Sequence, residues 1–168
     1  MTSDGVIGQA FECAAFAHAG EFRRASTTPF IVHPVRVAMS VWPYVDEHGI
    51  AAALLHDVVE MHETDISTFP EDVVETVSLL TCLNGGKPNA ESKADHIRRI
   101  CGSFLSPAIL IKMADRIDNL TDGAKAFSLS WRVRYLEHSE LLWRLVSETT
   151  YDDHPLQHEL RKVMDGLL

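Results

Sequence analysis

The sequence is short of basic residues and of cysteines, and each shortage excludes a class of protein. Lysine and arginine number 15 against 24 aspartates and glutamates, which gives a net charge of −9. A general nucleic-acid binder needs a broad basic face, so this class is excluded, whereas a small anionic substrate is compatible with a few local bases. The three cysteines are an odd number at irregular spacing, which indicates buried thiols rather than a disulfide framework or a cysteine-based zinc site.

Long apolar runs are also absent. No stretch approaches the roughly 20 apolar residues that cross a bilayer, and the first residues lack the basic-then-apolar pattern of a secretory signal. We therefore expect a cytoplasmic protein without a membrane partner. A length of 168 residues with 46% hydrophobic residues suits one domain over 1–168 with one core.

The alternating pattern of β-strands is nearly absent, and apolar residues recur instead at intervals of three and four. This periodicity predicts an all-α fold. Serines, aspartates, prolines and glycines at the expected ends, such as Ser3 or Asp4 before the first helix and Gly20 after it, delimit the elements. The predicted helices cover about 4–19, 34–42, 50–59, 70–80, 90–101, 108–120, 127–147 and 155–166.

Four residues of metal-ligand type stand out from this helical pattern. His33 lies at the entrance of one helix, His56 and Asp57 follow an apolar run that marks a buried central helix, and Asp115 lies on a second buried helix. A buried carboxylate costs several kcal/mol unless it meets a cation, a base or a metal. The alternative for Asp57 is a salt bridge. The alternative for Asp115 is a local ion pair, because the basic residues Lys112 and Arg116 lie close to it in the chain.

Polar neighbours accompany these ligands at helical spacing. Glu60 follows His56 by four residues, which would place it on the same helix face, where it could reach a water at the metal. An exposed charge at a helix end is the alternative. Asp115 and Asn119 share one face, with Lys112 nearby.

Three further histidines give no such signal. His48 and His96 lie among polar neighbours on faces that we expect to be solvated, and His18 is similar.

Two imidazoles and two carboxylates make a mixed nitrogen and oxygen ligand set. Such a set suits an octahedral divalent ion with open water positions better than a closed tetrahedral zinc, and manganese is our first choice. An ion of this kind polarises a phosphoryl oxygen and activates water, which predicts hydrolysis of a phosphoester or pyrophosphate.

Several separate motifs carry a resemblance to a known family. They are Ala17–Arg24, Pro29–Pro34, Ala52–Glu60 and Lys112–Leu120. In order and spacing these segments resemble the HD-domain superfamily, and more closely the hydrolase domain of the RelA/SpoT alarmone enzymes and their small standalone relatives. The resemblance implies a helical bundle of the HD type, a manganese ion, and removal of the 3′-pyrophosphate from guanosine tetra- or pentaphosphate, the alarmone of the stringent response.

The resemblance also implies roles for individual residues. His33, His56, Asp57 and Asp115 would hold the metal, and Glu60 would act with the water beside it. Arg24 falls where the family places a basic residue against the guanine base. Contacts with the rest of the nucleotide would come from Asn119, Tyr135, Lys112 and Arg116, the last two attracting phosphate in an otherwise acidic chain.

Two departures from the family pattern leave alternatives open. The residue after Glu60 is usually aspartate, but here it is Met61, whose thioether cannot transfer a proton. The basic residue usually found after Arg24 is Ala25. One alternative is therefore a catalytically weak or inactive regulatory protein that binds a nucleotide. Another is an HD phosphatase that acts on a different nucleotide.

Overall fold

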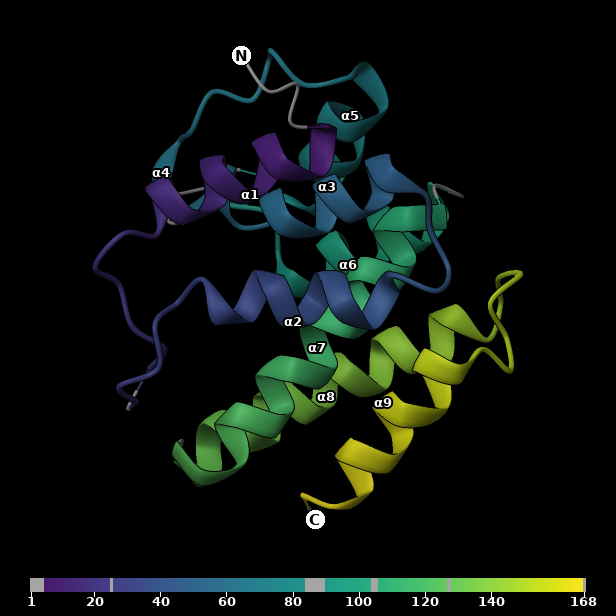
Figure 1. The fold of residues 1–168 in the computed structure, drawn as a ribbon. Coiled ribbons are helices and arrows are strands. Elements are labelled where there is room, and N and C mark those ends of the chain that lie inside the picture. Colours follow the sequence, from purple (N-terminus) through teal and green to yellow (C-terminus); the bar gives the residue numbers. More distant parts are fainter. Residues whose placement is uncertain (1–4, 25, 84–89, 104–105, 127, 168) are drawn as a thin grey trace. The chain divides into compact units, whose positions relative to one another are not determined.

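The computed structural model describes residues 5–24, 26–83, 90–103, 106–126 and 128–167, which form nine helices and a single isolated β-bridge between Phe22 and Pro29 (Figure 1). The all-α prediction is confirmed. These residues belong to two compact units, Met1–Thr81 and Cys82–Leu168. The single domain over 1–168 stays a prediction. None of the described helices is both long enough and apolar enough to cross a membrane.

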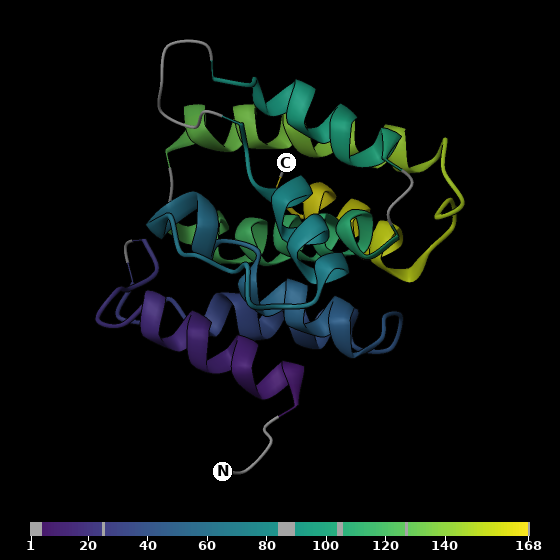
Figure 2. The same cartoon turned by 90° about the horizontal axis from the view of Figure 1, so that it is seen from above.

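The first unit contains α1 (Val6–Ala17), α2 (Val32–Val41), α3 (Glu47–Leu55), α4 (Val58–His62) and α5 (Glu71–Leu80). Helix α3 is its centre and packs against α1, α2 and α5 (Figures 1 and 2). All residues from Gly49 to Leu55 are buried, as expected for a helix that is apolar on every side. Asp46 caps α3 by accepting a hydrogen bond from the Gly49 amide at 3.0 Å.

The prediction of one helix over 50–59 is wrong. Helix α3 ends at Leu55, and α4 begins at Val58 after a two-residue turn made by His56 and Asp57. Glu60 and His56 therefore do not share a continuous helix face. The turn matters for chemistry, because consecutive residues of one α-helix point about 100° apart, whereas this turn lets both side chains approach the same point.

The second unit contains α6 (Lys93–Gly102), α7 (Ser106–Ala126), α8 (Leu129–Val146) and α9 (Pro155–Asp165). Helix α7 packs against α6, α8 and α9, and α8 also contacts α6 and α9. Ser92, Ser128 and His154 cap α6, α8 and α9 by accepting hydrogen bonds from backbone amides of the first turns. The predicted bounds are met within a few residues, except that α7 continues past Leu120 to Ala126.

Two details of the predicted elements need correction or fall outside the described residues. The proposed caps Ser3 and Asp4 lie outside the described residues, and Gly20 after α1 has a positive φ of 79°, which suits a chain reversal. His96 was expected to be solvated, but it is only 1% exposed, because it lies on the buried face of α6 beside Ile97 and Ile100.

Candidate functional site

Three of the four predicted metal ligands come together in the first unit. His33 is the second residue of α2, and its Nε2 atom lies 3.5 Å from Oδ2 of Asp57. The Nε2 atom of His56 lies 3.4 Å from the same oxygen. The two imidazole rings meet edge to face, with centroids 5.1 Å apart. His33 and His56 are 1% and 4% exposed, so the group is enclosed on its imidazole side.

Local structure fixes the orientation of each ligand. Pro34 stands in the first turn of α2, where its missing N–H costs nothing, and this places His33 at the helix entrance. The Nδ1–H of His56 donates to the Ala53 carbonyl at 2.8 Å, so its Nε2 presents a lone pair toward Asp57. Asp57 occupies the N-cap position of α4, yet its carboxylate faces the two imidazoles instead of capping that helix.

These residues fit a divalent metal ion. Metal-binding histidines usually donate their second ring N–H to a carbonyl or carboxylate, and His56 does so. Two imidazole nitrogens and one carboxylate oxygen lie close enough for one ion to contact all three. His33, His56 and Asp57 therefore form a candidate site for a divalent metal.

Glu60 and Met61 follow these ligands on α4. Both side chains are exposed, and Met61 is 46% exposed. Glu63 follows α4 as its C-terminal cap, and its φ of 51° lies in the left-handed region that favours glycine. Glu60 and Met61 thus face solvent, directly after the candidate metal site in the chain.

The fourth predicted ligand, Asp115, belongs to the second unit. It is 6% exposed, its Oδ2 receives a hydrogen bond from Lys112 at 2.9 Å, and its Oδ1 receives one from Asn119. The local ion pair foreseen as the alternative for Asp115 is therefore present. A role for Asp115 as a ligand of the same ion stays a prediction.

Arg116 and Tyr135, two predicted substrate contacts, stack on each other in the second unit. The guanidinium carbon of Arg116 lies 4.0 Å from the centroid of the Tyr135 ring. Trp131 stacks on Tyr135 at 4.2 Å with an interplanar angle of 18°. Two planar groups at these distances cannot share one face, so both faces of the Tyr135 ring are covered. A substrate would meet this tyrosine through its edge or hydroxyl.

Arg24 lies in the loop that joins α1 to α2. The loop is held by the Phe22–Pro29 bridge and by a hydrogen bond from the Arg23 amide to the Thr28 carbonyl at 2.8 Å. Arg24 is exposed, whereas the Arg23 guanidinium lies 5.5 Å from the centroid of the Phe30 ring. Ala25, the second departure from the family pattern, lies outside the described residues.

Sequence analysis missed a second histidine and carboxylate group in the first unit. His18 was expected to be solvated, but it is 2% exposed and contacts Glu21 and His62. The spacing of three residues between His18 and Glu21 was a weak local signal. Nothing in the sequence links His18 to His62, which lies 44 residues away.

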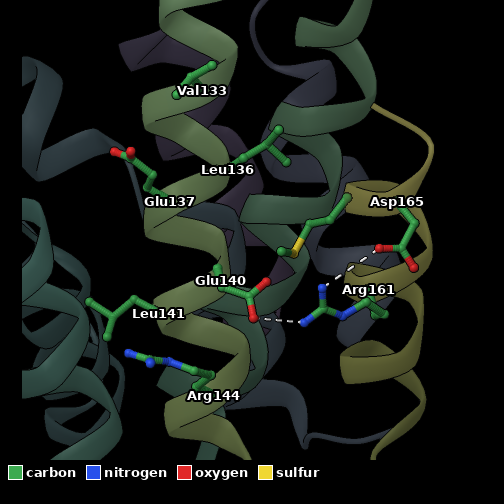
Figure 3. Close-up of a pocket in the computed structure, with 9 residues that line it drawn as sticks. Val133, Leu136, Glu137, Glu140, Leu141, Arg144, Arg161 and Asp165 are labelled. Carbon is green, nitrogen blue, oxygen red and sulfur yellow. Dashed lines mark hydrogen bonds and ion pairs between the residues drawn. The ribbon is translucent and has the colours of Figure 1, made fainter. Parts of the chain in front are cut away.

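A groove of about 500 Å³ lies between α8 and α9 (Figure 3). Its walls include Val133, Leu136, Leu141 and Met164, and Arg161 crosses its edge to contact Glu140 at 3.0 Å. The predicted site residues do not line this groove.

Comparisons with known proteins agree with these motifs. Residues 10–144 match the model of a family described as HD domain. A guanosine-3′,5′-bis(diphosphate) 3′-pyrophosphohydrolase of Aquifex aeolicus is 29% identical over 160 residues, which cover 92% of this chain and 21% of that protein. The bifunctional (p)ppGpp synthase/hydrolase SpoT of Escherichia coli is 34% identical over 123 residues, 68% of this chain and 17% of that protein. The chain thus spans about a fifth of the length of these curated relatives.

A solved structure matches the chain over its whole length. It is described in the words "A metazoan ortholog of SpoT hydrolyzes ppGpp and plays a role in starvation responses". The TM-score is 0.82 and the identity is 25%, and the match covers 100% of this chain and 99% of that one.

Proposed function

Because the chain belongs to the HD-domain family, we propose that it is a metal-dependent phosphohydrolase that converts guanosine 3′,5′-bis(diphosphate) to GDP and pyrophosphate. The observation that carries the proposal is the convergence of His33, His56 and Asp57 on one point at the break between α3 and α4. The full-length likeness to a metazoan protein that is described as hydrolysing ppGpp supports the choice of substrate.

The ion in this proposal is manganese, held by His33, His56, Asp57 and Asp115. A mixed set of imidazoles and carboxylates favours an octahedral divalent ion of this kind. When bound, such an ion offsets phosphate charge and lowers the pKa of a water molecule that it coordinates.

The side chains of this protein must also manage two protons. Hydrolysis at the 3′ phosphate breaks the bond between phosphorus and the 3′ oxygen, so water loses a proton and the departing oxygen gains one. Glu60 is proposed to accept the proton of the attacking water, because it is an exposed carboxylate on α4, the helix that follows Asp57. Met61 cannot supply the second proton, so the departing oxygen must be protonated by solvent or by Glu60 in turn.

Substrate binding needs local positive charge in an acidic protein. Residues 1–81 carry 12 aspartates and glutamates but only 3 arginines, so an anionic nucleotide is repelled unless the ion and nearby bases oppose this charge. Arg24 is proposed to stack on the guanine base, and Lys112 and Arg116 to face phosphate. Asn119 and the Tyr135 hydroxyl are proposed to contact the nucleoside.

A nucleotide panel tests this function. Tag-free protein with Mn²⁺ is incubated with guanosine tetra- and pentaphosphate, deoxynucleoside monophosphates and dinucleotide phosphates, and released phosphate and pyrophosphate are measured separately. We expect pyrophosphate from the guanosine 3′-diphosphates. Release of phosphate from another substrate would replace this proposal with an HD phosphatase of different specificity. Tight binding of guanosine tetraphosphate without turnover would instead assign a regulatory binding protein.

A further inference from the structure

A second group of metal-ligand atoms lies in the first unit, where the end of α1 meets the end of α4. His18 follows α1 as its C-terminal cap, Glu21 lies three residues later, and His62 is the last residue of α4. Their nearest polar atoms form a small triangle. Nδ1 of His18 is 3.0 Å from Oε2 of Glu21 and 3.1 Å from Nε2 of His62, and the last two atoms are 3.3 Å apart.

Hydrogen bonds among these three atoms cannot satisfy all of them at once. Each neutral imidazole carries one N–H, so at most two protons lie among the two imidazole nitrogens and the carboxylate oxygen. With two, one or no protons, at least one of the three contacts joins two donors or two acceptors. One ion satisfies all three lone pairs at once. Ligand atoms at about 2.0–2.1 Å from a tetrahedral zinc ion lie roughly 3.3 Å from each other, so the three observed distances are short enough for one such ion to contact all three atoms.

Burial and charge favour a cation at this position. The side chain of His18 is fully buried, whereas those of His62 and Glu21 are 24% and 37% exposed, so an ion has a path from solvent and room for a water molecule. Burial lowers the pKa of His18, and its hydrogen bond holds the pKa of Glu21 below the usual range. A neutral imidazole and an ionised carboxylate are the forms that bind metal.

A group of metal-ligand residues in the second unit differs from this triangle in the partner of its carboxylate. Cys82, Glu91 and His96 also lie close together, but Arg99 already binds both oxygens of Glu91 at 2.8 Å. A cation there would face a guanidinium. The group around His18 has carboxylate and imidazole atoms facing one another instead.

We propose that His18, Glu21 and His62 form a second metal site, which takes a zinc-type divalent ion through two nitrogens and one oxygen. Its residues differ from those of the site of His33, His56 and Asp57, and the ring of Phe30 packs on one histidine of each group. The Phe30 centroid is 4.5 Å from that of His18 and 5.8 Å from that of His33. The ion would tie the last turn of α4 to α1 and so fix the helix that carries Glu60. The site does not depend on the proposed hydrolysis.

Metal stoichiometry tests the proposal. The tag-free chain of residues 1–168 is stripped with a chelator, refilled with Zn²⁺ or Co²⁺ and passed through a desalting column before elemental analysis. The native chain should hold two ions, and the Co²⁺ form should show the visible absorption of a four-coordinate ion. In His62→Ala and Glu21→Gln one ion should remain and the absorption should fall, with affinity for the second ion lowered on the order of 100-fold or more. Asp57→Asn should lose the other ion and keep this absorption.

His48→Ala is the matched control, because His48 also pairs with a carboxylate of the first unit, Asp72 at 2.7 Å, outside both groups. It should keep two ions. Circular dichroism identifies variants that fold, and Glu21→Gln decides if His62→Ala does not. The proposal is overturned if the folded variants retain two ions, or if the native chain binds a single ion that disappears in Asp57→Asn.

Discussion

The carboxylates of the two units have different partners. In the first unit Asp57, Glu21 and Asp72 all face imidazoles, whereas in the second Glu91 faces Arg99 and Asp115 faces Lys112. The exposed pair of Asp153 with His158 is an exception in the second unit. Composition follows the same division. Residues 1–81 contain five histidines and no lysine, with 12 acidic residues against 3 arginines, while residues 82–168 carry 12 of each sign. Arginine and lysine stay charged at neutral pH, but imidazole is mostly neutral and can give its lone pair to a metal. The first unit is therefore suited to binding cations, and the second to fixed ion pairs.

The strongest way to break this comparison is to remove the carboxylate between His33 and His56. Asp57→Asn keeps the size of the side chain but lowers its affinity for metal, so we expect hydrolysis to fall roughly 1,000-fold or more. Elemental analysis should show the loss of one ion per chain. Asp72→Asn is the matched control, since its carboxylate also faces a histidine, and it should retain both metal and activity. Unchanged metal content in Asp57→Asn would remove Asp57 from the site.

A change at Met61 sharpens the comparison by adding a carboxylate to the first unit. Met61→Asp restores a group that can transfer a proton, so hydrolysis of guanosine tetraphosphate should rise about 10- to 100-fold. Metal content should not change. Met61→Leu, which keeps an apolar side chain, is the control and should leave the rate near its natural value. If the protein with Met61 already hydrolyses the substrate rapidly and Met61→Asp slows it, this site uses another proton donor.

Glu91→Gln breaks an ion pair of the second unit. The hydrogen bond from Arg99 lowers the pKa of Glu91 to about 2, from an ordinary value of 4.5. A depressed pKa stabilises the fold above pH 4.5, and this stabilisation is lost as the pH falls from 4.5 toward 2. Glu91→Gln should therefore cost roughly 1–3 kcal/mol of unfolding free energy at pH 7 and progressively less below about pH 4.5.

Urea unfolding at several pH values measures this difference, and it should be the same with and without Zn²⁺. Glu159→Gln is the control, because its pairing with Lys162 is exposed and should contribute about 0–0.5 kcal/mol. A pH-independent cost for Glu91→Gln would mean that packing, and not charge, stabilises this position.

The smallest expected effect is a gain in stability at Glu63, which ends α4 in the left-handed region. Glu63→Gly should stabilise the protein by about 1 kcal/mol, because glycine adopts a positive φ without a steric cost. Thermal unfolding measures the change. Asp153 has a similar φ of 65° but also accepts a hydrogen bond from His158, so Asp153→Gly should gain less. A lower midpoint for Glu63→Gly would show that the Glu63 side chain makes a stabilising contact.

Much of the fold was predictable from periodicity and capping residues. The convergence of His33, His56 and Asp57 was predictable as well, because each polar residue adjoins an apolar helix. Their role as metal ligands stays a prediction. The break at His56 and Asp57 was not, since the apolar residues Val58 and Val59 continue the pattern and no glycine or proline marks a turn. The predicted helix over 108–120 is shorter than α7, because the polar residues after Leu120 lack an apolar stripe.

The errors at His18 and His96 have different causes. His96 lies next to Ile97 and four residues before Ile100, so the stripe of α6 contained the signal for its burial. His18 meets His62 only through the packing of α1 against α4. No local periodicity reports a contact between residues so far apart in the chain.

The ligand atoms of both histidine and carboxylate groups come from one stretch of chain, residues 18–62, and meet only when α1, α2 and α4 are in place. An ion that binds these groups finds no comparable site in the unfolded chain. Each tenfold rise in free metal above the dissociation constant of a site therefore adds about 1.4 kcal/mol per bound ion to the unfolding free energy, up to the limit set by binding to the unfolded chain. The supply of metal thus becomes a variable of folding, and a cell short of divalent ions would hold less of this protein in its native state.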